Sequence, residues 1–249
     1  MTDFDVEGTF NADYLHFYLP GFTAERDEAE ATEIVEALDL VSDMRVLDAP
    51  CGHGRIANLL AGRGMYVVGA DLTELFLDKA RRDAALRGVV VDYRQLDLRE
   101  MNFDHEFDAA FSWFTSFGYN DDATDRDVLR RYHDALRPGG RFLIETQSIY
   151  RLVPLLVDGR GVSTHSERVG EDLLVDTTTL DALASRTLTE RVVVRDGRVR
   201  TTQFSVRLWT APELTSWLEG AGFRDVLITD RRGEPFTVQS PRMVVVSTA

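Results

Sequence analysis

Cysteine and lysine are almost absent from this 249-residue sequence, which contains a single Cys51 and a single Lys79. One cysteine cannot form an intramolecular disulfide, and this favours a reducing compartment, so we expect a cytoplasmic protein. No apolar run approaches the roughly 18 residues of a membrane-spanning helix. The acidic start MTDFDVEGTF also lacks the basic region of a secretion signal, so we expect no membrane partner.

Positive charge is scarce overall, because 28 Lys and Arg residues face 42 Asp and Glu residues and leave a net charge of −14. A protein that binds nucleic-acid phosphates needs a basic surface. The acidic balance therefore argues against a nucleic-acid partner and mildly favours neutral or cationic ligands. The 5 histidines are scattered without the spacing of metal ligands, so we also expect no metal site.

Short apolar segments alternate with helical patterns over the first part of the chain. This alternation predicts βαβ units and a parallel sheet covered on both faces. The strand-like segments are 45–49, 66–70, 89–94, 107–111 and 141–146, and the helical patterns are 25–38, 56–63, 74–87 and 124–136. A helix at 212–220 and strands at 226–229 and 242–248 follow. Only about a dozen residues separate those last strands, which predicts an antiparallel hairpin at the end of the sheet.

Residues 149–208 break the rhythm with alternating β patterns. They include Asp196–Gly197, and such an Asp-Gly pair between alternating strands is the strongest short hairpin signal. We therefore expect one α/β domain over residues 1–249 with an inserted antiparallel β-sheet at 149–208. The insertion is interpreted as a lid or substrate subdomain, and a dimerisation surface is the alternative. Monomer and homodimer both remain open.

The segment VLDAPCGHGR, residues 46–55, joins an apolar strand to a turn with Gly52 and Gly54. Ligands of open parallel sheets bind outside the carboxyl ends of the strands, and glycine lets them approach the backbone closely. Asp71 ends the second strand 19 residues after Gly52, where a carboxylate can accept both hydroxyls of a ribose. Asp97 follows the third strand, where it can meet the exocyclic amine of a base.

This spacing admits two cofactors. Gly52 and Gly54 followed by Ala57 also satisfy the G-x-G-x-x-G/A fingerprint of dinucleotide binding. Asp48 opposes that interpretation, because its carboxylate would repel a pyrophosphate but suits the positively charged amino-acid end of S-adenosylmethionine. Asp97 and the terminal hairpin oppose it too. An NAD(P)-dependent oxidoreductase and a catalytically idle cofactor-binding protein remain the alternatives.

Several segments, taken together and in order, resemble the motifs of the class I S-adenosylmethionine-dependent methyltransferases. They are VLDAPCGHGR, VVGADLT, LDLRE, FDAAFSWFTSFGY and LRPGGRFLIET. CGHGR, SFGY and the C-terminal PFT..SPRM are similar to a branch of small bacterial enzymes in that superfamily. The resemblance implies a Rossmann-like sheet of seven strands with the last antiparallel, S-adenosylmethionine as the cofactor, and methyl transfer to a small molecule. Pro50-Cys51 departs from the usual motif.

The resemblance also implies a set of cofactor-binding residues. Gly52 and Gly54 would let the backbone run close to the methionine part of the cofactor. The N-terminal segment would fold over the cofactor, with an aromatic side chain at the sulfonium and an arginine at the carboxylate. The full set is Tyr14, Tyr18, Arg26, Asp48, Gly52, Gly54, Asp71, Leu72, Asp97, Leu98, Ser112 and Trp113.

The substrate is expected to meet the aromatic loop after the fourth strand and the insertion. The candidates are Phe117, Tyr119, His165 and Arg207. No lysine or His–Asp constellation that would activate a phenol is visible, which slightly favours N-methylation over O-methylation. Tyr119 and His165 are the fallback catalytic bases. The identity of the methyl acceptor stays open.

Overall fold

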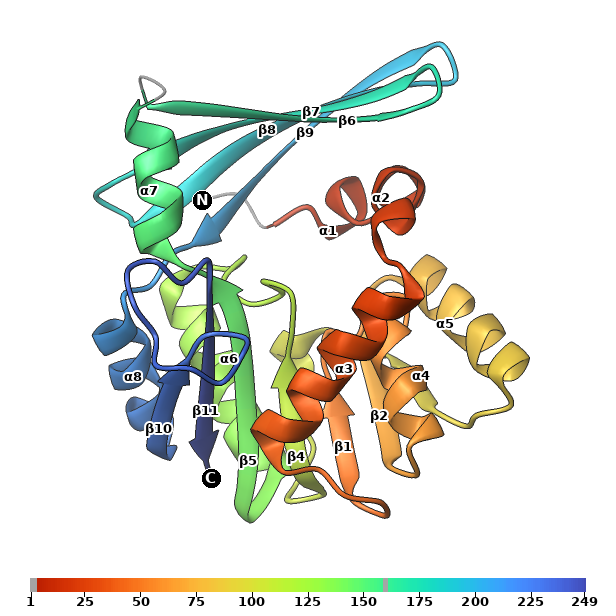
Figure 1. The fold of residues 1–249 in the computed structure, drawn as a ribbon, viewed down its shortest axis with the longest axis vertical. Coiled ribbons are helices and arrows are strands. Elements are labelled where there is room, and N and C mark those ends of the chain that lie inside the picture. Colours follow the sequence, from red (N-terminus) through yellow and green to blue (C-terminus); the bar gives the residue numbers. More distant parts are fainter. Residues whose placement is uncertain (1–3, 159–160) are drawn as a thin grey trace.

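The structure is a computed structural model that describes residues 4–158 and 161–249. It contains a large sheet and a small sheet, with helices around the large one (Figure 1). The strands of the large sheet are β1 (Arg45–Asp48), β2 (Tyr66–Asp71), β3 (Asp92–Gln95), β4 (Phe107–Ser112), β5 (Leu136–Gln147), β10 (Arg224–Thr229) and β11 (Arg242–Thr248).

The large sheet has the strand order β10-β11-β5-β4-β1-β2-β3. Neighbours from β3 to β5 pair in parallel, whereas β11 runs antiparallel to both β5 and β10. The predicted Rossmann-like sheet of seven strands with an antiparallel last strand is therefore confirmed. The limits differ locally: β3 starts at Asp92 rather than residue 89, and β5 starts at Leu136 and includes the Pro-Gly-Gly that we expected to precede it.

Helices cover both faces of this sheet. In β1, Val46 faces a cluster with α3 and α4, and the adjacent Leu47 faces a cluster with α6 and α8 on the other side of the sheet. In β5, Leu143 and the adjacent Phe142 face these two clusters in the same way. This alternation is the period of a strand buried on two sides. The helices are α3 (Ala24–Leu38), α4 (Arg55–Gly62), α5 (Glu74–Arg87), α6 (Asp122–Ala135) and α8 (Ala211–Gly220), with the 3₁₀ turn η2 (Leu98–Glu100) after β3.

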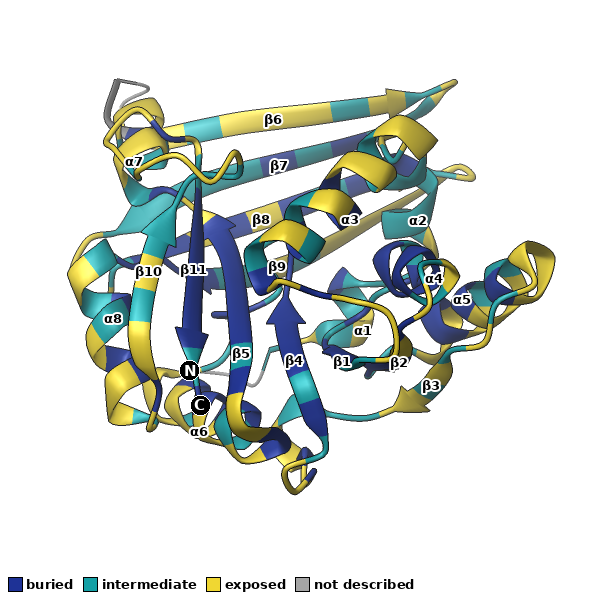
Figure 2. Cartoon of the chain, turned by 60° about the horizontal axis from the view of Figure 1, so that its bottom comes forward, coloured by how far each residue is buried: buried dark blue, intermediate teal, exposed yellow. Residues whose placement is uncertain are grey.

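The small sheet consists of β6 (Val162–Val169), β7 (Asp172–Asp181), β8 (Arg186–Arg195) and β9 (Arg198–Arg207), antiparallel throughout and in chain order. Asp196 and Gly197 have φ values of 54° and 69°, the left-handed pair that a two-residue hairpin turn requires, so the predicted hairpin is confirmed. Figure 2 shows that the edge strand β6 is largely exposed, whereas β4, β5 and β11 are buried.

The insertion starts with a helix, α7 (Ile149–Asp158), so the expected β pattern is wrong over this stretch. Its first turn forms because the Ser148 carbonyl accepts hydrogen bonds from the backbone N–H groups of Arg151 and Leu152 at 3.1 Å. Leu152 and Leu156 are four residues apart, which is a helical spacing, and Leu156 is fully buried. Pro154, which usually interrupts helices, obscures this period in the sequence.

The N-terminal segment lies between the small sheet and the carboxyl ends of the large sheet's strands (Figures 1 and 2). It comprises α1 (Val6–Thr9), α2 (Ala12–Tyr18) and the 3₁₀ turn η1 (Leu19–Gly21). Asn11 caps α2 by accepting the backbone N–H groups of Asp13 and Tyr14. Phe17 packs on Leu174 and Val193 of the small sheet. The segment therefore contacts the insertion through an apolar patch as well as through polar groups.

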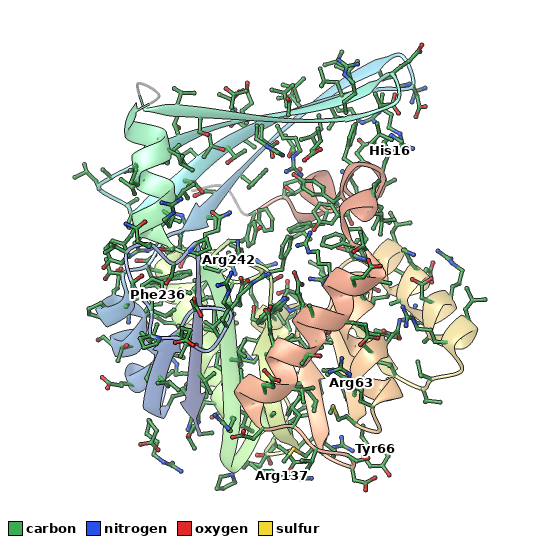
Figure 3. The ribbon with its side chains drawn as sticks, in the orientation of Figure 1. His16, Arg63, Tyr66, Arg137, Phe236 and Arg242 are labelled. Atoms are coloured by element: carbon green, nitrogen blue, oxygen red, sulfur yellow. The ribbon has the colours of Figure 1, made fainter. Side chains whose placement is uncertain are left out.

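Two buried glutamates tie distant parts of the chain together. Glu30 of α3 accepts hydrogen bonds from Trp113 Nε1 at 2.9 Å and from Arg231 Nη1 at 3.0 Å. Glu145 of β5 is fully buried and accepts a bond from Arg231 Nε at 2.8 Å. Arg231 therefore bridges both acids. Arg242 also binds Glu145 and lies at the end of the large sheet that faces the small one (Figure 3).

The ion pairs change how Glu30 titrates. Burial by itself would raise the pKa of this carboxyl, but Arg55, Trp113 and Arg231 outweigh burial and lower its pKa to about 2, against an ordinary 4.5. A carboxyl whose pKa is depressed by folding stabilises the fold fully above its unfolded pKa. That stabilisation is lost as the pH falls from about 4.5 towards about 2.

Glu30→Gln should therefore reduce the free energy of unfolding at pH 7 by about 3–5 kcal/mol, because it leaves buried arginines without their partner. It should also flatten the loss of stability on acidification towards pH 3. Urea denaturation at several pH values measures both effects. Glu28→Gln is the matched control on the same helix: Glu28 is 56% exposed and pairs with Arg63, so the change should cost less than about 1 kcal/mol. Equal effects of the two variants would contradict this account.

Candidate functional site

A cavity opens at the carboxyl ends of β1, β2 and β4 and is covered by the N-terminal segment. The empty space in and in front of it, open solvent included, is about 1140 Å³. Its walls are the turn after β1, the ends of β2 and β3, the loop after β4, and side chains of residues 4–22.

The two glycines of the turn after β1 differ in role. Gly52 lines the cavity with φ of 55°, and a Cβ built on it would meet no atom within 4 Å. Its backbone is therefore open to a ligand. Gly54 has φ of 75° and precedes α4, and a Cβ on it would collide with the Tyr93 hydroxyl and lie 2.6 Å from Ala80 Cβ. Gly54 thus permits α4 to pack closely and does not line the cavity.

Asp71 ends β2 and fixes the turn that it faces. Its Oδ2 accepts the backbone N–H of Gly52 and its Oδ1 accepts that of Thr73, both at 2.8 Å. Burial raises the pKa of this carboxyl, although the bonds from Thr73 and Gly52 act in the opposite direction. Each carboxylate oxygen can accept a further hydrogen bond. Asp71 and the adjacent Leu72 both line the cavity.

Asp97, at the start of η2, also lines the cavity but is already paired. Both carboxylate oxygens accept bonds from the Arg99 side chain, at 2.6 to 3.0 Å. Burial would raise the pKa of Asp97, but the hydrogen bonds of Arg99 prevail and lower it. An exocyclic amine would therefore share this carboxylate with Arg99.

Asp48 is a buried acid beside the cavity. The nearby cation, Arg55, is bound to other acids. Only 3% of the residue is exposed, and burial raises its pKa well above the usual value, opposed by Arg55 and reinforced by Asp71. Arg55 donates to Asp27 Oδ1 at 3.0 Å and to Glu30. A positively charged group that enters the cavity would therefore find in Asp48 a carboxylate without its own direct arginine partner.

Aromatic side chains form the roof. Phe4 stacks on Tyr119 with ring centroids 4.6 Å apart, and Phe10 packs against Tyr14 at 5.3 Å. Burial raises the pKa of Tyr14 and of Tyr119, so both phenols stay neutral. Aromatic faces in such a setting attract a nearby cation.

The structure brings most of the predicted cofactor residues to this one cavity. The predicted residues that line it are Tyr14, Asp48, Gly52, Asp71, Leu72, Asp97, Leu98, Trp113 and Tyr119.

Other predicted cofactor residues lie outside the cavity lining. The Tyr18 hydroxyl accepts a bond from Arg191 of the small sheet at 2.9 Å. Arg26 is held by Glu30 Oε1 at 3.0 Å and by a backbone carbonyl, so its guanidinium is committed within the fold. Ser112 is buried within β4. Arg55 and Arg99 line the cavity, whereas Arg26 does not.

Three substrate candidates also lie away from the cavity lining. Phe117 is buried and stacks on Trp209 at 5.2 Å. His165 lies on the edge strand β6, 58% exposed, and pairs with Glu167. Arg207 donates to backbone carbonyls and to Asp122 and Glu213, which leaves it bound within the fold. The structure therefore gives no support to His165 as a base at this site.

The cavity also contains residues outside the predicted set of site residues. His53 lines it as a neutral imidazole, because burial, Arg55 and Lys79 lower its pKa to about 4. Phe76, Ser116 and Asn120 line it too. Over the described ranges 4–158 and 161–249, no group of three or more His, Cys, Asp or Glu residues is placed to hold a metal ion. In the same ranges no helix is long and apolar enough to cross a membrane.

Comparison with known proteins shows which family this chain resembles. A family model described as a methyltransferase domain matches residues 46–140. The demethylmenaquinone methyltransferase of Clavibacter sepedonicus is 29% identical over 202 residues, which cover 80% of this chain and 74% of that protein. The ubiquinone biosynthesis O-methyltransferase of Marinobacter nauticus is 33% identical over 103 residues, 41% of this chain and 43% of that protein. The chain is therefore similar to methyltransferases over residues 46–140, and to one curated methyltransferase over most of its length.

Solved methyltransferase structures share this fold over nearly the whole chain. The CcbJ methyltransferase of Streptomyces caelestis superposes with a TM-score of 0.76 at 20% identity, covering 98% of this chain and 99% of that one. The S-adenosylmethionine-bound amino pentose methyltransferase CalS10 of Micromonospora echinaspora gives 0.66 at 21%, covering 93% and 94%. In sequence, the chain spans about half the length of most of the curated relatives it matches.

The cavity residues fit the cofactor of this family. The open backbone at Gly52 leaves room for a ligand, and the buried Asp48 suits an ammonium group. Asp71 retains acceptor capacity for hydroxyls, and the aromatic roof suits a sulfonium. The ammonium group, the ribose hydroxyls and the sulfonium of S-adenosylmethionine therefore each have a chemically matched group in the cavity.

The contrast between the glycines gives a test. Gly54→Ala should lower the free energy of unfolding by about 2–4 kcal/mol, since it adds a steric clash to a left-handed backbone. Gly52→Ala should cost only about 1–2 kcal/mol, from backbone strain alone, but should weaken S-adenosylhomocysteine binding because its methyl group enters the cavity. Urea denaturation and calorimetry measure the two effects. The assignment fails if Gly52→Ala binds normally or is the less stable variant.

Proposed function

We propose that this protein transfers the methyl group of S-adenosylmethionine to a small-molecule acceptor. The observation that carries the proposal is the single cavity in which Asp48, Asp71 and the open backbone of Gly52 meet under an aromatic roof. Asp48 would hold the ammonium group, and Asp71 the ribose hydroxyls.

The adenine would lie between apolar side chains at the ends of β2 and η2. Leu72 and Leu98 line that part of the cavity, and Asp97 is placed to accept the exocyclic amine. Tyr14 and Trp113 would border the methionine part. When bound, the cofactor supplies an electrophilic methyl group. The residues of this chain then contribute by orienting the acceptor and excluding water, which is the main source of rate when no difficult bond activation is needed.

The acceptor is proposed to be an amine rather than an alcohol. A hydroxyl needs a base, whereas a neutral amine is already nucleophilic. Tyr119 is a neutral phenol with a raised pKa, and His53, with a pKa of about 4, is a weak base. Among the named relatives one is an O-methyltransferase and one structural neighbour acts on an amino pentose. Transfer of a labelled methyl group to matched amines and alcohols decides between them, and turnover of alcohols alone would overturn the preference.

The insertion at 149–208 is proposed to anchor the N-terminal segment as a lid. None of its described residues lines the cavity, so this proposal gives the small sheet an indirect role there. Instead, Arg195 and Arg200 bind Asp13 at 3.0 and 2.7 Å. His16 lies 2.9 Å from Asp172, and Figure 3 shows it on the side of α2 near the small sheet. The sheet would thus hold Tyr14 and Phe10 over the cavity.

The cofactor assignment predicts the effect of Asp71→Ala. This change should weaken S-adenosylhomocysteine binding by about 2–4 kcal/mol, because each charge-assisted hydrogen bond contributes about 1.5–3 kcal/mol. Isothermal calorimetry measures it. Asp104→Ala removes an acid that is 92% exposed and should bind normally. Unchanged affinity in Asp71→Ala, or binding of NAD by the native protein, would overturn the assignment.

The lid proposal predicts a change in hydrogen exchange. Backbone amides of residues 8–22 should exchange more slowly once S-adenosylhomocysteine binds, since lids over active sites are often mobile when empty. Asp13→Asn should speed their exchange in the free protein by removing both arginine contacts. Glu7→Gln, an exposed change in the same segment, should not. If the exchange rates of residues 8–22 change neither with S-adenosylhomocysteine nor with Asp13→Asn, a lid anchored in this way is excluded.

A further inference from the structure

A fully buried acid with a free oxygen lies directly behind the cavity. Asp125 is in the first turn of α6 and has no exposed surface. Its Oδ1 accepts a hydrogen bond from Asn120 Nδ2 at 3.1 Å, whereas its Oδ2 has no partner among the described residues. Asn120 itself lines the cavity beside Tyr119. Neither Asn120 nor Asp125 has a part in the cofactor binding proposed above.

The pair fixes which end of the Asn120 amide faces the cavity. A carboxylate accepts hydrogen bonds and cannot donate them, so it holds the NH₂ end of the amide. The carbonyl oxygen is then left for the cavity side, and within the described residues no donor binds it. A cavity-lining amide oxygen with an open lone pair is a binding group for N–H or O–H donors.

The small sheet holds the loop that carries this amide. Arg186 Nη2 donates to the Gly118 carbonyl at 2.9 Å, and the backbone N–H of Arg207 donates to the same oxygen at 2.8 Å. Gly118 has φ of 104°, and a Cβ on it would lie 2.5 Å from the Trp209 ring. The loop is therefore held against the insertion two residues before Asn120. A binding group on a loop fixed from both sides is preorganised.

We propose that Asn120 binds the N–H of the methyl acceptor through Oδ1, and that Asp125 is the positioning residue that sets the direction of this amide. The proposal rests on the proposed function and deepens it to an acceptor that donates an N–H. An amide oxygen accepts a hydrogen bond but is not a base, so it suits a nucleophile whose nitrogen already carries a lone pair. A hydroxyl that must lose its proton would gain little here.

The charge state of Asp125 gives the pair a signature of its own. Burial raises the pKa of Asp125 to about 7, whereas Asn120 and Arg186 lower it and Asp122 raises it further. The charged groups around it are Asp121 and Asp122 near the start of α6, Arg186 of β8 and Arg207 of β9. When Asp125 is ionised, it can only accept, so it must bind the NH₂ end of the Asn120 amide. When Asp125 is protonated, it can also donate to the amide oxygen of Asn120, so the amide is free to take either orientation.

The experiment is nuclear magnetic resonance of the side-chain amides in ¹⁵N-labelled full-length protein with saturating S-adenosylhomocysteine. Methylamine is the probe, and tetramethylammonium, a cation with no N–H to donate, is the matched control; loss of the signal in Asn120→Ser assigns the Asn120 resonance. Methylamine should shift that resonance saturably and tetramethylammonium should not. The exposed Asn102 is the internal reference. Shifts of Asn120 no larger than those of Asn102, or equal responses to both probes, would overturn the binding role.

The positioning role is tested by Asp125→Asn, which should weaken the apparent affinity for methylamine about tenfold or more, the effect of one charge-assisted hydrogen bond. Asp122→Asn changes an acid in the same turn that is 52% exposed and should leave the response intact. In the native protein the Asn120 NH₂ signals should titrate with a midpoint near 7, a readout that needs no variant to fold. A flat titration, or a native response in Asp125→Asn, would overturn positioning.

These outcomes are separate from the cofactor assignment. Calorimetry with S-adenosylhomocysteine should give native affinity in Asn120→Ser and Asp125→Asn, because neither residue contacts the proposed nucleoside or methionine groups. Failure of the native protein to bind S-adenosylhomocysteine would refute the proposed function. Normal cofactor binding without an Asn120 response to methylamine would refute only the acceptor site.

Discussion

The burial of two glutamates under a shared arginine is the interaction on which the site depends. Glu30 and Glu145 could not remain ionised inside the protein without paired donors, because isolated buried charges are very costly. Arg231 bridges the two acids, and Trp113 and the backbone N–H of Phe114 complete their hydrogen bonds. The same bonds therefore fix the start of the loop after β4, a cavity wall, relative to α3 and β5. Stability and site geometry have one physical origin here.

The small sheet acts on the cavity through two intermediaries rather than as a wall. On one side it binds the N-terminal segment through Asp13 and Tyr18, which places Tyr14 in the roof. On the other side, Arg186 and Arg207 hold the Gly118 carbonyl and so fix the loop after β4. Under the lid proposal, an insertion that holds both the N-terminal segment and this loop would change acceptor specificity without touching the groups at the ends of β1 and β2. This separation agrees with the general observation that one fold accommodates many activities through its loops.

Local patterns allowed the fold to be predicted, because strand period and turn chemistry are properties of neighbouring residues. Val46 and Leu47 alternate between two cores, and Asp196–Gly197 forms the expected turn. The acids Asp71 and Asp97 both line the cavity, as their positions after strands predict, since carboxyl ends of parallel strands meet at one edge. Gly54, Arg207 and His165 do not line it, because tertiary partners decide their positions. Tyr93 and Ala80 fill the space beside Gly54, Glu213 and Asp122 take Arg207, and the edge position of β6 leaves His165 exposed. No pattern along the sequence identifies these partners.

The helix α7 was missed for a local reason, since Pro154 masks its period.

Burial drives most groups around the cavity towards their neutral forms. It raises the pKa of Tyr14 and Tyr119 and lowers that of His53 to about 4. The charged groups that persist are mostly paired within the protein: Arg55 with Asp27 and Glu30, and Asp97 with Arg99. Asp48 differs, because Arg55 influences it only at a distance and its pKa is raised well above the usual value. A cation that entered beside Asp48 would favour its ionised form, so ligand binding and deprotonation would be coupled. The electrostatics therefore favour a positively charged group beside Asp48, although the walls around it are predominantly apolar and neutral.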